Sequence, residues 1–379
     1  MAERKVSPLT EYMFYKAGRL GNPLSGTFEL TPMCNFSCRM CYVRKTAEQV
    51  RSSERPMRTL DQWLSLAKEA RDAGMLYLLL TGGEPMVWSG FWELYEELSE
   101  MGLVVSINTN GSMLTDDAVR KLEMHPPRRV NITMYGANDS TYEKLCRVRN
   151  MFSVVDHSIM KLKEAGIQVK LNCSLTPYNA GDLEDMVVYA KERELILDIA
   201  TYMFPPLRRN EAMVGRNERF TPEESAYYRL KAYRLQYDEE QYEKYLEMIQ
   251  KGNAPAEGAD ESCIDPVDGK IRCRAGKASF WATWDGWLTP CGMMTEPKVD
   301  LAGRSFPEAW KELKEVSGRV AVSGICSKCS GLQICHSCAA MAQTETGTFS
   351  GIPSYLCATV REMKRLADEE RTEKKVSDK

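Results

Sequence analysis

Thirteen cysteines are spread unevenly along this chain of 379 residues, and their spacing gives the first indication of chemistry. Cys34, Cys38 and Cys41 lie close together in Cys-Asn-Phe-Ser-Cys-Arg-Met-Cys. Three thiolates cannot complete a four-coordinate structural zinc site unaided. They can hold a [4Fe–4S] cluster by three of its irons and leave the fourth open. Because an open iron is where a substrate can bind, the triad predicts a catalytic cluster.

A second group of cysteines lies in the C-terminal third. Its eight members are Cys263, Cys273, Cys291, Cys326, Cys329, Cys335, Cys338 and Cys357. Eight thiols make two complete four-thiolate sets, which can hold two further iron–sulfur clusters. The alternative is structural zinc, because cysteines separated by two residues are also typical of zinc ribbons.

Composition limits the compartment and the partners. The net charge is −3, from 50 basic and 53 acidic residues, which disfavours binding to nucleic acid. The N-terminus has no signal-peptide pattern, and no stretch approaches the roughly eighteen apolar residues of a membrane span. We therefore expect a cytoplasmic protein without membrane contact. Thiols stay reduced in the cytosol, so the cysteines are expected to bind metal rather than to form disulfides.

Strand-like and helix-like patterns alternate over residues 26–204. The predicted strands are Thr27–Leu30, Leu76–Leu80, Val104–Ile107, Val130–Thr133, Val169–Leu175 and Leu195–Ala200. Helical periodicity is found near 59–73, 90–101, 115–123, 151–165 and 180–193. This alternation predicts an α/β fold, a partial (β/α)6 TIM-like barrel with a parallel sheet. Ligands of such folds bind at the carboxyl ends of the strands.

The pattern changes after residue 204. We predict five regions: an N-terminal extension (1–25), the barrel (26–215), a helical bridge and linker (216–262), an irregular cysteine-rich domain (263–360) and a charged tail (361–379) that frays as a solvated helix. Thr221-Pro222-Glu223-Glu224 is a capping box that opens a bridge helix. Six tyrosines follow it, and we interpret them as packing on the barrel; the alternative is a lid that grips substrate. Gly252–Gly258 is a plausible linker.

The triad, with Met40 before its last cysteine, resembles the signature of the radical S-adenosylmethionine (SAM) superfamily, which carries this loop after the first barrel strand. In many members the position of Met40 is aromatic. The second strand ends in Thr81-Gly82-Gly83-Glu84-Pro85, which resembles the superfamily's Gly-Gly-Glu-Pro motif. Paired glycines allow close approach to the backbone, and a carboxylate can accept hydrogen bonds from an ammonium. The resemblance implies that Gly82, Gly83, Glu84 and Pro85 receive the amino group of SAM.

Further polar residues follow the later strands. Asn108 and Asn110 lie in Asn-Thr-Asn-Gly, where the family often places a similar motif near the SAM ribose. After Tyr135-Gly136, either Arg147 or Arg149 is a candidate for the SAM carboxylate. Asn172 and Ser174 share one face of the fifth strand, which either contacts SAM or packs on helices.

The resemblance also implies the chemistry, which the cofactor supplies. A donor such as ferredoxin or flavodoxin reduces the cluster, SAM is cleaved, and the 5′-deoxyadenosyl radical abstracts hydrogen from the substrate. Such an enzyme is sensitive to oxygen. Cys146 and Cys173 are interpreted as small buried hydrophobes, and the alternative is a thiol that returns hydrogen to a substrate radical.

The C-terminal cysteines resemble the SPASM domain, an extension of radical SAM enzymes that often modify peptides or proteins. The last gap of its central block is two residues here instead of three, which makes Cys338 the least secure ligand. The family's crossed ligation implies one cluster on Cys263, Cys273, Cys291 and Cys338, and another on Cys326, Cys329, Cys335 and Cys357. Asp285-Gly286 predicts the hairpin that presents Cys291.

The leading hypothesis is radical modification of a peptide or protein side chain. One alternative is oxidation or rearrangement of a small molecule; another is a non-catalytic iron–sulfur carrier, although a carrier needs no SAM pocket. Only 33 residues precede Cys34, too few for the N-terminal peptide-recognition domain of many peptide-modifying relatives. Gly292 stands where sulfatase-maturing relatives have an aspartate, which disfavours that activity.

Overall fold

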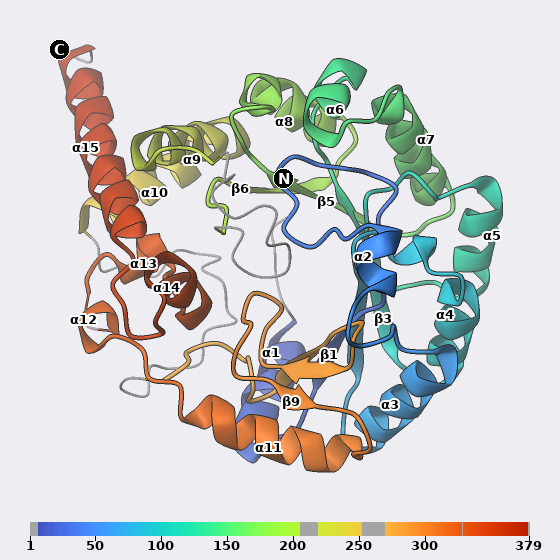
Figure 1. The fold of residues 1–379 in the computed structure, drawn as a ribbon. Helices are drawn as coiled ribbons and strands as arrows, with labels where there is room; N and C mark the ends of the chain where they lie inside the picture. Colours follow the sequence, from blue (N-terminus) through green and yellow to red (C-terminus); the bar gives the residue numbers. More distant parts are fainter. Residues whose placement is uncertain (1–6, 205–218, 252–269, 328, 378–379) are drawn as a thin grey trace.

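The computed structural model describes residues 7–204, 219–251, 270–327 and 329–377. All six predicted strands are present and parallel: β1 (Ser25–Glu29), β2 (Tyr77–Thr81), β3 (Val104–Thr109), β4 (Arg129–Thr133), β5 (Val169–Ser174) and β6 (Ile196–Ala200). The connections between them contain α2 (Ala47–Arg51), α3 (Leu60–Asp72), η1 (Pro85–Val87), α4 (Phe91–Glu100), α5 (Asp116–Met124), α6 (Asp139–Cys146), α7 (Met151–Glu164), η2 (Ala180–Asp182) and α8 (Leu183–Glu192). Figure 1 shows α3 to α8 in an arc outside the strands, which confirms the predicted partial barrel.

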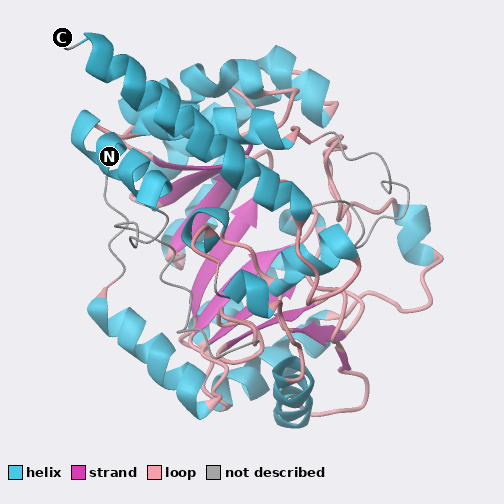
Figure 2. Ribbon diagram, turned by 90° about the vertical axis from the view of Figure 1, so that its left-hand side faces the viewer, coloured by secondary structure: helices cyan, strands magenta, loops and turns pink. Residues whose placement is uncertain are grey.

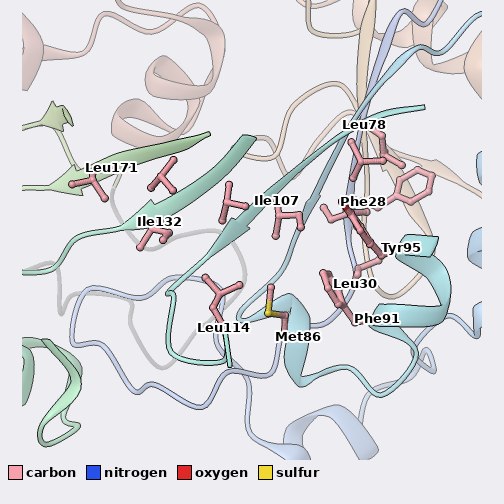
Figure 3. Packing of buried hydrophobic residues seen from close by; sticks show 14 of the residues in the cluster. Phe28, Leu30, Leu78, Met86, Phe91, Tyr95, Ile107, Leu114, Ile132 and Leu171 are labelled. Atoms are coloured by element: carbon pink, nitrogen blue, oxygen red, sulfur yellow. The ribbon is translucent and has the colours of Figure 1, made fainter. Parts of the chain in front are cut away.

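Alternate residues of each strand form the main core, under these helices. Phe28 and Leu30 of the first strand segment, Ile107 of β3 and Leu171 of β5 are all fully buried on this face (Figure 3). Phe91 and Tyr95 of α4 pack on the same cluster. Burial of each such side chain is worth about 1.5–3 kcal/mol, so this face fixes the register of the strands. The opposite face of each strand therefore points into the barrel.

The sheet continues into the cysteine-rich region. Strand β7 (Ser279–Ala282) pairs in parallel with β1, and β8 (Trp287–Thr289) and β9 (Val299–Asp300) follow in antiparallel order. The described order is β6-β5-β4-β3-β2-β1-β7-β8-β9, with β6 and β9 at its edges. Figure 2 shows the strands in the middle of the molecule, with helices around them. Gly286 turns the β7–β8 hairpin at a φ of +90°, as Asp285-Gly286 predicted. The barrel and the cysteine-rich region thus share one sheet.

The bridge forms α9 (Pro222–Gln236) and α10 (Glu239–Lys251), and the capping box of Thr221 and Glu224 is confirmed. Both helices pack on α15 (Ser354–Ser377) in a second core. The rings of Tyr233, Tyr237 and Tyr245 contact one another there in tilted and edge-on arrangements. This supports packing rather than a lid, although the packing partner is mainly α15.

The sequence predicted that the charged tail would fray from residue 361 onward as a solvated helix. In the structure it continues α15 instead. Met363 and Ala367 are fully buried within α15, because residues four apart share a helix face that the surrounding charges concealed. At the other end of the chain, α1 (Pro8–Leu20) buries Phe14 and Ala17 against Leu24. The sequence did not predict this helix.

The remaining helices belong to the C-terminal region: α11 (Phe306–Gly318), α12 (Gly324–Ser327), α13 (Leu332–Cys335) and α14 (Ala339–Thr346). The predicted linker and Cys263 lie outside the described residues. No helix in the described part of the chain combines the length and the apolar character needed to cross a membrane.

Candidate active site

The triad lies in an irregular loop directly after β1, as predicted. All three thiols are free and partly buried. Backbone N–H groups point at two sulfurs: Phe36 donates to Cys34 and Arg44 donates to Cys41, both at 3.3 Å. Burial raises the pKa of the Cys34 thiol to about 12, so a neighbouring cation is needed to hold it as a thiolate. Three thiols, two of them with backbone N–H donors, fit an iron–sulfur cluster, which would supply that positive charge.

Gly82 and Gly83 bring the end of β2 against this loop. The N–H of Gly83 donates to the Thr31 carbonyl at 2.7 Å, and the N–H of Glu84 donates to the Met33 carbonyl at 2.9 Å. A Cβ atom would meet the Thr31 oxygen at 2.5 Å from position 82 and the Met33 oxygen at 2.3 Å from position 83. Only glycine fits such contacts. The paired glycines are therefore required by the cysteine loop itself, before any ligand is considered.

Glu84 joins the ends of β2 and β3. Its carboxylate is fully buried and accepts hydrogen bonds from the Thr109 hydroxyl, the Asn110 N–H and the Met86 N–H. Burial raises the pKa of Glu84 to about 7, although these hydrogen bonds favour the charged form. Sequence reasoning assigned this carboxylate to SAM; the structure gives it a bracing role between two strand ends. Pro85 follows as the first residue of η1.

The two asparagines after β3 have different surroundings. The side-chain amide of Asn110 donates to the Asn35 carbonyl oxygen at 2.8 Å and approaches the Cys34 sulfur at 3.7 Å. Asn110 therefore supports the cysteine loop. Asn108 points into the barrel, where its side-chain oxygen accepts from Asn131 of β4 at 2.8 Å.

The fifth strand alternates as expected. Asn172 and Ser174 are half-buried on the barrel side, whereas Cys173 lies on the helix side, 3.8 Å from the sulfur of Met186. Cys173 is thus a buried thiol facing α8. Cys146 is fully buried at the end of α6, where its carbonyl accepts from the Ser37 N–H of the cysteine loop at 3.1 Å.

The structure places Arg147 and Arg149 on the surface. Both are exposed, and Arg149 pairs with Glu143 at 2.8 Å.

Sequence reasoning missed a polar layer inside the barrel. Glu29 is fully buried and accepts from the indole N–H of Trp281 at 2.8 Å, while Lys170 pairs with Asp198 of β6. The available signal was a charged residue between apolar ones, as in Phe28-Glu29-Leu30. Such buried charges are costly unless they are paired, so they mark the inner wall as a polar surface.

The C-terminal cysteines gather in two places. Cys273, Cys291 and Cys338 share one small core. The other group is Cys326, Cys329, Cys335 and Cys357, in which Cys357 lies near the other three. Among the seven described cysteines, these are the two sets that the crossed arrangement assigns to separate clusters, and their ligation stays a prediction.

Two contacts join this region to the barrel. The hydroxyl of Tyr42, next to Cys41, lies 3.2 Å from the sulfur of Met293, two residues after Cys291. Glu345 of α14 accepts from Tyr202, just after β6, at 2.9 Å and forms a two-pronged pair with Arg219. The pair is largely buried, so it fixes α14 against the barrel mouth.

Comparisons with known proteins agree with this architecture. The AdoMet-dependent heme synthase of Methanosarcina barkeri is 23% identical over 337 residues, which cover 85% of this chain and 93% of that protein. The structure of anSMEcpe with bound AdoMet and the Kp18Cys peptide superposes with a TM-score of 0.68 at 18% identity, covering 92% of this chain and 98% of that one. SuiB of Streptococcus suis, bound to its precursor peptide SuiA, gives a TM-score of 0.63 at 16% identity, covering 92% of this chain and 79% of the SuiB chain.

The sequence profile of the radical SAM superfamily matches residues 28–190, which contain the cysteine triad, the Gly-Gly-Glu-Pro turn and strands β2 to β5. Together with the barrel and the converging loops at its carboxyl edge, this match makes the chain a member of the radical SAM superfamily.

Proposed function

We propose that this radical SAM enzyme abstracts hydrogen from a peptide or protein side chain. The observation that carries the SAM chemistry is the convergence of the triad, the Gly82-Gly83 turn and Asn110 at one edge of the sheet. When bound, the cluster and SAM supply a carbon-centred radical. The likeness in fold to two enzymes whose structures contain peptides supports a peptide substrate.

Each group of residues has its own proposed role. Cys34, Cys38 and Cys41 hold the cluster, and the Gly82–Pro85 turn lies beside it to receive the amino group of SAM. Asn108, Asn172 and Ser174 line the barrel side of their strands, where they would meet the ribose or the substrate. Lys170 and Asp198 extend the polar wall, so the substrate contacts charged and amide groups away from bulk water.

The C-terminal region is proposed to be a SPASM-like domain with two auxiliary [4Fe–4S] clusters, held by the two cysteine groups with Cys263 completing the first. Clusters whose irons are all ligated by cysteines suit electron transfer, because the surrounding protein can tune their reduction potential without displacing a ligand. The proposed electron donor is a cytoplasmic ferredoxin or flavodoxin.

A small-molecule substrate is the second candidate. It is favoured by the sequence similarity to the heme synthase, which extends over 93% of that protein. A porphyrin would be the first compound of this class to try.

The test is SAM cleavage by anaerobically reconstituted protein with a strong reductant. We expect 5′-deoxyadenosine from the wild type and none from the Cys34→Ala/Cys38→Ala/Cys41→Ala variant; cleavage at the wild-type rate by this variant would refute the site. Deuterated peptides and a porphyrin then separate the two candidates. Deuterium in 5′-deoxyadenosine from the peptide supports the leading proposal, and turnover of the porphyrin alone overturns it.

A further inference from the structure

A pocket lies outside the barrel, between α3, the β7–β8 turn and the segment that joins β9 to α11. Its volume is about 530 Å³, within the range of roughly 300–1,000 Å³ that is typical of small-ligand sites. Strand β7 runs parallel to β1, so the β7–β8 turn lies at the same edge of the sheet as the cysteine loop. Figure 1 shows α3 and α11 side by side on the outer side of the sheet. The described residues that line this pocket are separate from those of the candidate active site.

Two guanidinium groups face the same point in this pocket. Gly286 occupies the β7–β8 turn, and a Cβ atom at its position would lie 3.7 Å from Nη1 of Arg58 and 3.9 Å from Nη1 of Arg55. The φ of +90° favours glycine at this turn, and the missing side chain leaves the space beside both groups open. Because like charges repel, two guanidinium groups that face one point favour an anion there.

Arg55 is fixed by the residues around it. One Nη atom pairs with the Asp300 carboxylate, and the other donates to the Asp285 carbonyl at 3.3 Å. The guanidinium also lies over the Trp287 ring, 4.0 Å from its centroid. Arg55 therefore supplies a positive charge that is held in place and already hydrogen-bonded by the protein.

Arg58 has hydrogen-bonding capacity left. Its Nη2 donates to the Gln62 carbonyl at 2.9 Å, and its guanidinium lies 5.2 Å from the centroid of the Trp63 ring. Among the described residues, no carboxylate lies within 4 Å of its nitrogens, and neither Nη1 nor the buried Nε has an acceptor. A half-buried guanidinium is costly unless its donors are used. Nη1 is the donor that faces the space beside Gly286.

Three carboxylates also line the pocket, and each accepts a hydrogen bond from a neighbouring group. Asp285 accepts from the Thr283 hydroxyl at 2.5 Å, and Asp300 is paired with Arg55. Glu69 accepts from the first backbone N–H of α11 at 2.6 Å. These carboxylates balance the three arginines of the lining, so a polyphosphate would be repelled. A single carboxylate matches the unused edge of one guanidinium group.

We propose that this pocket binds a molecule through one carboxylate group, which Nη1 of Arg58 receives beside the positive charge of Arg55. Two sources supply such a group, an acidic side chain of a peptide and a free organic acid. The proposal does not depend on the radical reaction, because binding is measured without turnover.

The experiment is calorimetric titration of the anaerobic holoenzyme with acetyl-Gly-Glu-Gly-amide, whose glutamate carries the only charge, with butyrate and with inorganic phosphate. We expect both carboxylates to bind more tightly than phosphate, and acetyl-Gly-Gln-Gly-amide not to bind. Arg58→Gln should weaken carboxylate binding about tenfold or more, because a hydrogen bond between two charged groups is lost. The matched control is Arg71→Gln, since Arg71 lies in α3 outside the pocket and pairs with Asp72. This control should leave the affinity unchanged.

A second variant fills the pocket instead of removing the charge. Ser65 is an exposed residue of the lining, so Ser65→Phe enlarges it without entering the core and should weaken binding as well. If Arg58→Gln does not fold, Ser65→Phe decides by the same criterion.

The relative affinities of the two carboxylates identify the source. Tighter binding of the glutamate peptide identifies a peptide side chain, and butyrate binding at least as tight identifies a free organic acid; either result upholds the carboxylate site. The inference is overturned if neither carboxylate binds, if phosphate binds more tightly than both, or if Arg58→Gln and Ser65→Phe keep the wild-type affinity.

Discussion

The two cysteine regions are built in different ways. The triad occupies one short loop whose backbone and side chains are held by the Gly82-Gly83 turn, by Asn110 and by the end of α6. The C-terminal groups draw cysteines from segments far apart in sequence, and the helices α12 and α13 between them have only four residues each. The protein therefore pre-organises the first site, whereas the proposed auxiliary clusters would organise much of the second. This difference predicts unequal responses to metal loss.

The largest expected effect follows removal of iron by anaerobic chelation. Residues of α12 to α14 should lose most of their protection against hydrogen exchange. The proposed metal–thiolate bonds close long loops there and so offset the entropy cost of ordering these segments. Strands β2 to β5 should keep theirs, since they rest on the main core. Equal loss of protection in both regions would show that the barrel site also depends on metal for its fold.

The next effect concerns the pre-organised loop. Gly83→Ala would place a Cβ atom 2.3 Å from the Met33 carbonyl oxygen and force the loop outward. We expect loss of about four irons per chain, no SAM cleavage, and destabilisation of about 1–3 kcal/mol. Gly181→Ala is the control, because a Cβ there meets nothing within 4 Å. A fully loaded, active Gly83→Ala protein would contradict this account of the loop.

The sequence revealed the loop but not the structure that supports it. The six strands could be predicted because strand-like patterns alternate with helix-like patterns along the chain. The triad could be predicted from the spacing of its cysteines. Both are local signals. Pairing of β1 with β7 joins Ser25 to Ser279, and no local pattern carries such a contact. The role of Glu84 was also hidden, since a carboxylate that braces two strands has the same sequence signature as one that binds a ligand. Likewise, nothing near Cys146 indicated that its carbonyl would accept a hydrogen bond from Ser37 of the cysteine loop.

A smaller effect is expected at Glu84. Glu84→Ala leaves the Thr109 hydroxyl and the Asn110 N–H without this acceptor, which should cost about 1–3 kcal/mol in the free energy of unfolding. Chemical denaturation of the iron-free protein measures it, with Glu84→Gln as the conservative comparison. A free energy of unfolding in Glu84→Ala equal to that of the wild type would exclude the bracing role.

The last effect is a pH dependence of the free energy of unfolding that comes from the same group. The folded-state pKa of about 7 lies above the ordinary value of 4.5, so between them the folded state binds more protons than the unfolded state. The free energy of unfolding should therefore fall as pH rises from about 4.5 to 7. Glu84→Gln should flatten this slope of the free energy of unfolding against pH. An equal slope in the wild type and in Glu84→Gln would show that other groups cause it.

Metal counting on anaerobically purified protein tests the contrast between the two regions most directly. Three four-iron clusters predict about twelve irons per chain and no stoichiometric zinc. The Cys34→Ala/Cys38→Ala/Cys41→Ala variant should retain about eight irons and its fold, because only the pre-organised site is lost. About two zinc ions per chain, with about four irons that disappear in the triad variant, would contradict the account and make the C-terminal region a structural zinc domain.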